Sequence, residues 1–297
     1  MVGTARRYRV HLDTGDVELI CAGRPERFRR LLSRVFPGGV ALEAVTTRVP
    51  LWNPHRFSAA YAPAVAVEIH PAFAEKFRAA GWLTCPDLVR WRGAVADMPP
   101  AHPDRSLRID LRRVEKAGYV LQEAAGSRPE WDEFRRDMLV PHALRRFGEN
   151  ANIPVPALLR KLEKDGTLLF LVKRGRRVAG QAVLRNRDEA WLAALGVKDG
   201  DPNLMKEGAV AGLYALTIDW AREHGVRYVD AGRSPAFALH GLAEYKRKWG
   251  MSPAREPFSH MLALRVDPAH QGVRLALQRE PFWIDRGSGE LEIFPPR

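Results

Sequence analysis

The sequence predicts an α/β fold in which a mixed, mostly antiparallel sheet is flanked by helices. Three features of the chain lead to this prediction: β-branched runs of strand length, short turns that join successive runs, and amphipathic helical segments between them. The 297 residues suit one large or two small domains, and an apolar content of 46% is sufficient to bury a core.

A proline-rich segment marks the expected domain boundary. It spans Asp97–Asp104, holds three prolines in eight residues and contains few apolar side chains. Prolines in such numbers interrupt both helices and sheets. We therefore expect residues 1–103 to form an N-terminal half and residues 104–297 to form a second domain.

The N-terminal half is expected to alternate strands and helices, and it shows no catalytic constellation. The expected elements are the strands Tyr8–Asp13, Val17–Cys21 and Ala64–Ile69, the helices Arg24–Val35 and Pro71–Ala80, and the extended segment Trp82–Trp91.

The second domain is expected to open with a basic amphipathic helix, Ser106–Ala117, which has Ser106 as its N-cap and ends at Gly118. A short strand and two helices should follow. These are Tyr119–Glu123, Pro129–Phe147 and Pro156–Lys164.

Three strands separated by short turns come next, as in antiparallel hairpins: Thr167–Lys173, Arg177–Arg185 and Ala190–Val197. The longest helical pattern then runs from Glu207 to His224 and ends at Gly225. The predicted order closes with the strand Val226–Asp230, the helix Gly241–Trp249 and the strand His260–Val266.

The chain is strongly basic, with a net charge of +12 at pH 7. Such a charge is typical of proteins that bind polyanions, for example tRNA, a nucleotide-linked substrate, coenzyme A or an anionic membrane surface. A compositional bias is the alternative, because 38 arginines stand against nine lysines, as in proteins from GC-rich genomes. The charge alone does not separate the two.

Several classes of protein are not expected. Two cysteines make neither a disulfide framework nor a cysteine zinc site, and the nine histidines lack the HxH and HExxH spacings of metal sites. No run of 18 apolar residues occurs, and the N-terminus lacks the apolar core of a secretory signal. We expect a cytoplasmic protein without a membrane span or a metal.

Three motifs follow one another in the second domain. They are the helix end IDWAREHG at residues 218–225, the strand exit VDAGRS at residues 229–234 and the helix segment YKRKWG at residues 245–250. In order and spacing they resemble motifs of the GNAT acyltransferase superfamily, specifically its Fem-like branch. The basic helix at residues 106–118 is similar to the one that opens the catalytic half of such proteins, and the resemblance covers roughly residues 104–266.

This resemblance implies a GNAT-like sheet, with the catalytic domain at residues 104–297 and a degenerate GNAT-like half at residues 1–103. It also implies transfer of an acyl or aminoacyl group from an activated donor to an amine, which forms an amide. One departure concerns the donor: the usual pyrophosphate loop would lie within residues 198–212, which do not match it. A second departure is the absence of a long helical arm, so a cell-wall role is not implied.

The donor is expected to be an aminoacyl-tRNA, because the pyrophosphate loop is missing and the surface is basic; an acyl-CoA is the alternative. No tightly bound cofactor is expected, and the acceptor would be a small-molecule or peptide amine. A GNAT scaffold that only binds nucleic acid or a partner protein is the rival from another class. The sequence does not indicate the oligomeric state.

Asp230, Lys246 and Tyr245 are the expected catalytic residues. Asp230 ends a strand, where it could orient or deprotonate the acceptor amine, or could cap the turn that follows. Lys246 matches the family's helix-borne lysine and could stabilise developing negative charge, or could be a solvated lysine. Tyr245 could protonate the leaving group, or could pack on the sheet.

A second set is expected to bind the donor and its phosphates: Gly196, Lys206, Gly208, Arg233, Ser234 and Lys248. GNAT-like sheets diverge between the fourth and fifth strands, and Gly196 would let a ligand approach there, unless it is a plain β-bulge. Lys206 and Gly208 are expected at a helix N-terminus, which favours anions. Arg233 suits a phosphate or carboxylate, or an internal pair with Asp230.

A third set is expected to contact tRNA. Arg108, Arg112, Arg113 and Lys116 recur at spacings of three or four residues and form one basic helix face, which could equally be a solvated surface.

Overall fold

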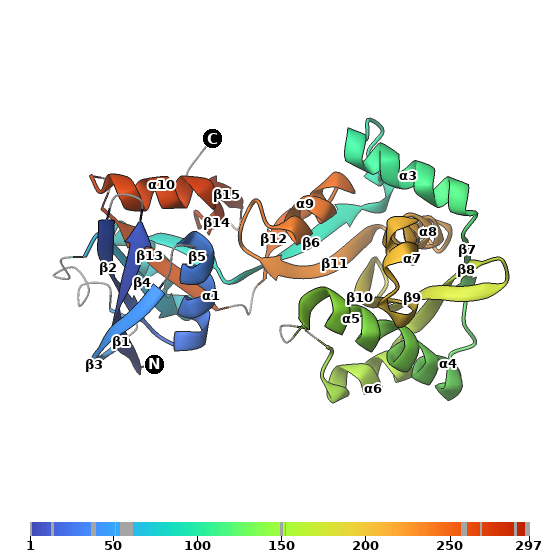
Figure 1. The fold of residues 1–297 in the computed structure, drawn as a ribbon, viewed down its shortest axis with the longest axis horizontal. Helices are drawn as coiled ribbons and strands as arrows, with labels where there is room; N and C mark the ends of the chain where they lie inside the picture. Colours follow the sequence, from blue (N-terminus) through green and yellow to red (C-terminus); the bar gives the residue numbers. More distant parts are fainter. Residues whose placement is uncertain are drawn as a thin grey trace. The chain divides into compact units, whose positions relative to one another are not determined.

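The computed structural model describes residues 2–12, 15–36, 40–50, 52–53, 62–148, 151, 153–256, 260–267, 269–287 and 290–294. The chain divides into two compact units (Figure 1). The first unit comprises Met1–Arg90, Arg233–Glu244 and Pro253–Arg297, and the second comprises Trp91–Gly232 and Tyr245–Ser252. No helix among the described residues is long and apolar enough to cross a membrane.

The second unit contains most of a seven-stranded sheet with the order β12-β6-β11-β10-β9-β8-β7; Leu88–Arg90 of β6, Arg233–Pro235 of β11 and Pro253–Arg255 of β12 belong to the first unit. Antiparallel pairing joins β7 to β8, β8 to β9 and β9 to β10, whereas β10 and β11 are parallel. The strands are β6 Leu88–Ala94, β7 Val120–Glu123, β8 Thr167–Lys173, β9 Arg176–Arg185, β10 Glu189–Val197, β11 Tyr228–Pro235 and β12 Ser252–Arg255. This is the mixed, mostly antiparallel sheet that the sequence predicts.

Helices cover both faces of this sheet. Helix α8 (Ala209–Glu223) packs on one face, where its Leu213 shares an apolar cluster with Val197 of β10. The opposite face carries Phe134 and Met138, which pack with Ala194. The remaining helices of the unit are α3 Arg105–Ala117, α4 Arg128–Glu133, the π-helix η4 Phe134–Leu139, α5 Val140–Phe147, α6 Pro156–Asp165 and α7 Pro202–Lys206, with the 3-10 turns η3 Val95–Asp97 and η6 Lys198–Gly200. Helix α9, Gly241–Lys248, contributes its second half to this unit.

The first unit contains a six-stranded sheet with the order β3-β1-β2-β4-β13-β5. Its strands are β1 Val2–Leu12, β2 Gly15–Ala22, β3 Val40–Pro50, β4 Ala64–Ile69, β5 Leu83–Pro86 and β13 Met261–Val266. The helices are α1 Pro25–Val35, α2 Ala74–Ala79 and α10 Gln271–Arg279, beside the short helix η2 Pro71–Phe73 and the hairpin of β14 Phe282–Asp285 and β15 Leu291–Phe294.

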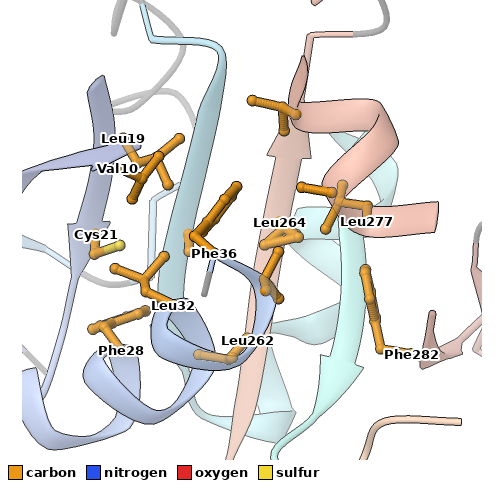
Figure 2. Close-up of a cluster of buried hydrophobic side chains, with 14 of the residues drawn as sticks. Val10, Leu19, Cys21, Phe28, Leu32, Phe36, Leu262, Leu264, Leu277 and Phe282 are labelled. Carbon is orange, nitrogen blue, oxygen red and sulfur yellow. The ribbon is translucent and has the colours of Figure 1, made fainter. Parts of the chain in front are cut away.

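The core of the first unit lies between this sheet and helices α1 and α10. Figure 2 shows Phe36, just after α1, among side chains of both neighbouring regions: Leu19 and Cys21 from β2, and Leu264 from β13. Leu277 of α10 belongs to the same buried cluster. The core therefore joins segments from both ends of the chain.

The units do not follow the expected division at residues 103 and 104. The strand expected at His260–Val266 was assigned to the second domain, but β13 pairs with β4 and β5 in the sheet of the first unit. Pairing with strands that lie about 180 to 200 residues earlier in the chain leaves no local mark in the sequence, which is why the pattern predicted the strand but not its sheet.

The first helix of the second unit begins one residue earlier than expected. Asp104 is its N-cap, because the Asp104 carboxylate accepts the N–H of Leu107 at 2.7 Å. Ser106, the expected cap, lies inside the helix. Gly118 ends the helix in a left-handed conformation, as predicted (φ 63°). Of the expected strand Tyr8–Asp13, Asp13 lies outside the described residues.

Candidate functional site

Strands β10 and β11 separate after three residue pairs. The parallel register joins Glu189–Trp191 to Tyr228–Asp230 and stops there, although β10 continues to Val197 and β11 to Pro235. A bulge between Leu192 and Ala194 interrupts the pairing of β10 with β9 nearby. Among the described residues, the β11-facing edge of β10 beyond Trp191 has no partner in that ladder. This is the divergence that the GNAT resemblance implied.

Asp230 lies at the point where the two strands separate. Its side chain is buried, with 2% of the residue exposed, and its Oδ1 accepts the N–H of Gly232 at 2.8 Å. Gly232 has a φ of 70°, which favours glycine, so the backbone departs from regular strand geometry here, although β11 continues to Pro235. The turn-capping role of Asp230 is therefore present in the structure, and its role toward an amine stays a prediction.

Lys246 approaches the same turn from helix α9. It is 5% exposed, and its Nζ donates to the carbonyl oxygen of Gly232 at 3.2 Å. Burial lowers the pKa of Lys246 to about 8, and the negative charge of Asp230 acts in the opposite direction. The expected catalytic pair is thus brought together around one glycine, and the lysine is not a solvated surface residue.

Tyr245 is placed in an aromatic cluster. Its ring meets that of Tyr214 edge to face, with centroids 5.3 Å apart, and Trp249 packs against Tyr214 at 5.5 Å. Burial raises the pKa of Tyr245. The Trp249 indole lies close enough to lower that pKa slightly, but the buried hydroxyl of Tyr245 is not in hydrogen-bond geometry with it or with any other described group. The arrangement favours the packing role of Tyr245 over proton donation.

Sequence reasoning missed three residues of this region. Tyr214 is buried on α8; burial raises its pKa, and the charge of Asp230 adds to that rise. Arg146 on α5 is exposed, and its charge partly offsets the raised pKa of both Tyr214 and Tyr245. The Trp191 Nε1 atom lies 3.6 Å from the point where a Cβ on Gly232 would stand. None of the three belongs to a recognisable motif, so no local signal could have found them.

Lys248, expected among the phosphate-binding residues, forms an internal ion pair. Its Nζ lies 2.5 Å from the Asp110 carboxylate and 3.3 Å from the Ser106 hydroxyl, and it stands over the Tyr245 ring at 4.3 Å. Its side chain is 11% exposed. These contacts connect the end of α9 to α3, and they engage the ammonium group with Asp110, Ser106 and the Tyr245 ring.

The backbone of the π-helix η4 packs against Gly196 on the side where a Cβ would stand, so no ligand can approach from that side. A Cβ there would lie 2.3 Å from the carbonyl carbon of Met138 and 2.4 Å from the nitrogen of Leu139, both in η4. The expectation that this glycine lets a ligand approach is wrong for that side of the strand, because the π-helix backbone occupies the space. The alternative of a β-bulge at Gly196 is also wrong, since the irregularity lies between Leu192 and Ala194.

Two further expected residues follow Asp230 along β11. Arg233 is exposed, as a residue that meets an anion would be. Ser234 is 2% exposed, and its hydroxyl donates to the carbonyl of Pro235 at 3.2 Å, so its Oγ bonds to backbone. Anion binding by either residue stays a prediction.

Lys206 and Gly208 lie on different helices: Lys206 is at the end of α7, and Gly208 is at the start of α8. Lys206 is the exposed last residue of α7, not a member of the helix start that follows. Gly208 is the N-cap of α8, with a φ of 92°, and is buried against Arg113 and Val114 of α3. The helix N-terminus expected at Gly208 is therefore present, and helix α3 covers the Cβ side of that glycine.

The basic face of α3 is present as predicted. Arg108, Arg112, Arg113 and Lys116 are all exposed, and only Arg113 has an ion pair among the described contacts, with Asp110 at 3.5 Å. Arg105 extends the row by one helical turn. We call Arg105, Arg108, Arg112 and Lys116 the α3 basic row. In the described part of the chain, no group of three or more His, Cys, Asp or Glu side chains is arranged to hold a metal ion.

Similar structures have been solved for several other proteins. L-PGS from Bacillus licheniformis is 14% identical over 92% of this chain and 88% of its own, with a TM-score of 0.45. FemX is 11% identical over 87% and 88%, with a TM-score of 0.46. A GCN5-related N-acetyltransferase from Kribbella flavida is 17% identical over 86% and 83%, with a TM-score of 0.31. No curated protein sequence matches the chain.

The family comparison is more specific than these distant likenesses. Residues 104–247 match the acetyltransferase (GNAT) domain family. The matched segment contains α3, the divergent strands β10 and β11, and the helix that carries Lys246. The resemblance predicted from the sequence motifs is thereby confirmed for residues 104–247, which are similar to the acetyltransferase (GNAT) domain.

Proposed function

We propose that this protein transfers an aminoacyl group from an aminoacyl-tRNA to the amine of a small molecule or peptide, forming an amide. The observation that carries the proposal is the buried arrangement of Asp230 and Lys246 around Gly232, at the point where β10 and β11 separate. The GNAT match supports an acyltransferase, and the choice of donor is the proposal's finer part.

The chemistry assigned to Lys246 is stabilisation of the oxyanion. When the amine attacks the ester carbonyl of the donor, negative charge develops on the carbonyl oxygen. An ammonium group that is already buried and held by the Gly232 carbonyl needs little reorganisation to stabilise that charge. With a pKa of about 8, Lys246 is mostly protonated at neutral pH, as this role requires.

Asp230 is assigned to the acceptor amine. The attacking amine must lose a proton as the amide forms, and a carboxylate within reach can orient the amine and accept that proton. One of the carboxylate oxygens is held by the Gly232 N–H, which fixes the direction of the group. The leaving group is the ribose hydroxyl of the tRNA 3′ end, which takes up a proton as the ester bond breaks.

The tRNA is assigned to the α3 basic row. Arg108, Arg112 and Lys116 are exposed and have no ion pair among the described residues, so their charges are available to phosphates. The ion pair of Asp110 on α3 with Lys248 on α9 connects the two helices, and Lys248 lies two residues after Lys246 in sequence. A tRNA acceptor stem on α3 would therefore lie on an element connected to the catalytic helix.

The test combines binding and transfer. Binding of charged tRNA is measured against salt for the wild type and for Arg108→Ala/Arg112→Ala/Lys116→Ala. The matched control, Arg160→Ala/Lys161→Ala/Lys164→Ala, removes the same charge from exposed positions of α6. We expect the α3 variant to lower the slope of log K against log salt by about 2 to 3, because each lost phosphate contact contributes about 0.7–0.9. Equal losses in both variants would point to a general charge effect and contradict the α3 site.

The donor is decided by product formation. Purified protein is incubated with a mixture of radiolabelled aminoacyl-tRNAs or with acetyl-CoA, each with a pool of amines and short peptides, and the amide products are identified by mass spectrometry. Amides formed only from acetyl-CoA would replace the proposal with the acyl-CoA-dependent alternative, which the description of the matched family favours. Binding without any product would favour a scaffold that lacks catalysis.

A further inference from the structure

The first unit contains an apolar cavity of about 180 Å³ between its sheet and the helices α1 and α10. Residues two apart on β2, β4 and β13 point to this side of the sheet, so the floor of the cavity follows from strand alternation. Leu32, Leu264 and Leu277 stand around it, and Figure 2 shows these side chains facing one another across the core.

Small side chains account for the empty volume. Cys21 on β2, Ala64 and Ala66 on β4, and Cys85 on β5 all line the cavity. Larger aliphatic residues at these positions would fill it, as they do in ordinary cores, which are packed with few voids larger than a water molecule. The space is therefore a consequence of four particular residues.

The lining of the cavity includes a cation. Arg34 on α1 lines it, and its side chain is 32% exposed, so it contacts both the cavity and solvent. The Nε of Arg34 donates to Glu280 at 2.9 Å, and its guanidinium lies over the Phe237 ring at 5.1 Å. Its two terminal nitrogens donate to no described residue. Asp87 and His240 are the other acidic or basic residues of the lining.

We propose that this cavity binds an unbranched aliphatic chain of about six to eight carbon atoms whose carboxylate meets Arg34. Dry cavities of about 150 Å³ lined by Leu, Ile and Phe hold a six-carbon apolar molecule, and this cavity is slightly larger. Guanidinium and carboxylate form charge-assisted hydrogen bonds, and the terminal nitrogens of Arg34 donate to none of the residues that the structure describes. All lining residues belong to the first unit, so this site does not depend on the proposed transferase function.

The first experiment is calorimetric titration of the full chain with octanoate, butyrate and octylamine. Octanoate is expected to bind, and butyrate about 200-fold more weakly, because four buried methylene groups are lost. Octylamine is expected to bind at least about tenfold more weakly than octanoate, since its cation faces Arg34. Equal binding of octanoate and butyrate, or no binding of octanoate, would overturn the proposal.

Variants locate the site. Ala66→Leu fills part of the cavity and should reduce octanoate affinity at least tenfold, and Arg34→Met should remove the preference for octanoate over octylamine. Leu275→Ala is the matched control, because Leu275 is an exposed apolar residue of α10 outside the lining. A loss of affinity in the control alone would assign binding to the surface of α10 and overturn the cavity site.

A second measurement is independent of whether Ala66→Leu folds. Cys21 and Cys85, the two cysteines of the chain, both line the cavity and are buried. Octanoate should slow the modification of both thiols by N-ethylmaleimide in the native wild type, whereas butyrate at the same concentration should not. Unchanged rates at an octanoate concentration that saturates the calorimetric signal would contradict binding in the cavity.

Discussion

In the first unit, buried carboxylates lie against arginines, whereas the second unit buries a lysine whose pKa is lowered. Glu68 is 3% exposed and accepts both the backbone N–H and the guanidinium of Arg24. Asp285 is 1% exposed and lies 3.4 Å from the Arg255 guanidinium. Lys246 donates to the carbonyl of Gly232, and burial lowers its pKa to about 8 in spite of Asp230.

The comparison distinguishes a buried charge that stabilises the fold, that of Glu68, from one that destabilises it, that of Lys246. A guanidinium stays protonated at all ordinary pH values, so Arg24 remains a cationic hydrogen-bond partner of the Glu68 carboxylate. For Lys246, the lowered pKa means that the folded protein disfavours the protonated amine relative to the unfolded chain. Groups with such perturbed pKa values cluster at functional sites, and this one lies beside the separated strands.

The largest expected effect is on catalysis. Lys246→Met should lower kcat/KM for amide formation about 10²- to 10³-fold, the range found when an oxyanion-stabilising donor is removed. The free energy of unfolding at pH 7 should not fall, since a buried charge is removed. Steady-state kinetics and urea unfolding measure the two quantities.

Lys248→Met is the control on the same helix. Lys248 pairs with Asp110 and has no assigned catalytic role, so this variant should lose about 1–2 kcal/mol of stability and keep most of its kcat. An equal loss of activity in Lys248→Met and Lys246→Met would contradict the assignment of a catalytic role to Lys246 and a structural role to Lys248.

The next effect is on stability as a function of pH. The pKa of Lys246 is about 8 in the folded protein and 10.5 in a model peptide, so between these values the unfolded chain binds more protons. Stability contributed by this residue therefore rises with pH through that window. From pH 7.5 to pH 10.5, the free energy of unfolding of the wild type should rise by about 3 kcal/mol relative to that of Lys246→Met. A constant difference across these pH values would show that burial does not shift the pKa.

A smaller effect is expected from the arginine-paired carboxylate. Glu68→Gln should destabilise the protein by about 1–2 kcal/mol, because Arg24 is half exposed and can regain water. Transferase activity should be unchanged.

Asp230→Asn provides the contrast for that substitution. The amide oxygen of asparagine can still accept the Gly232 N–H, so stability should change by less than about 1 kcal/mol while activity is lost. Retained activity in Asp230→Asn would remove Asp230 from the catalytic set.

The smallest effect is the pH dependence of the wild-type rate. If protonated Lys246 stabilises the oxyanion, kcat should fall as pH rises above about 8 and reach about one tenth of its plateau at pH 9. Lys246→Arg should move this decline to higher pH, because its guanidinium stays charged. A rate that increases through pH 8 would instead identify Lys246 as a base.

Much of the second unit could be predicted because its signals are local. Gly118 and Gly225 end helices where expected, both with positive φ, and the strand Thr167–Lys173 has the predicted bounds. The convergence of Asp230 and Lys246 followed from the family motifs. What could not be predicted depends on contacts between distant segments: the Lys248 pair with Asp110, the helix packed on Gly196, and the place of β13 in the other sheet.

The turn at Gly232 has a consequence for the direction of the chain. Its N–H is bonded to Asp230 and its carbonyl oxygen to Lys246, so the two peptide planes on either side of this residue are each anchored by a different side chain. The φ of Gly232, which lies between those planes, is 70°, a value that glycine permits. Lys246 therefore helps to hold the peptide that leads into Arg233. A change in the charge of Lys246 would alter its hydrogen bond to the Gly232 carbonyl, and with it the orientation of that peptide.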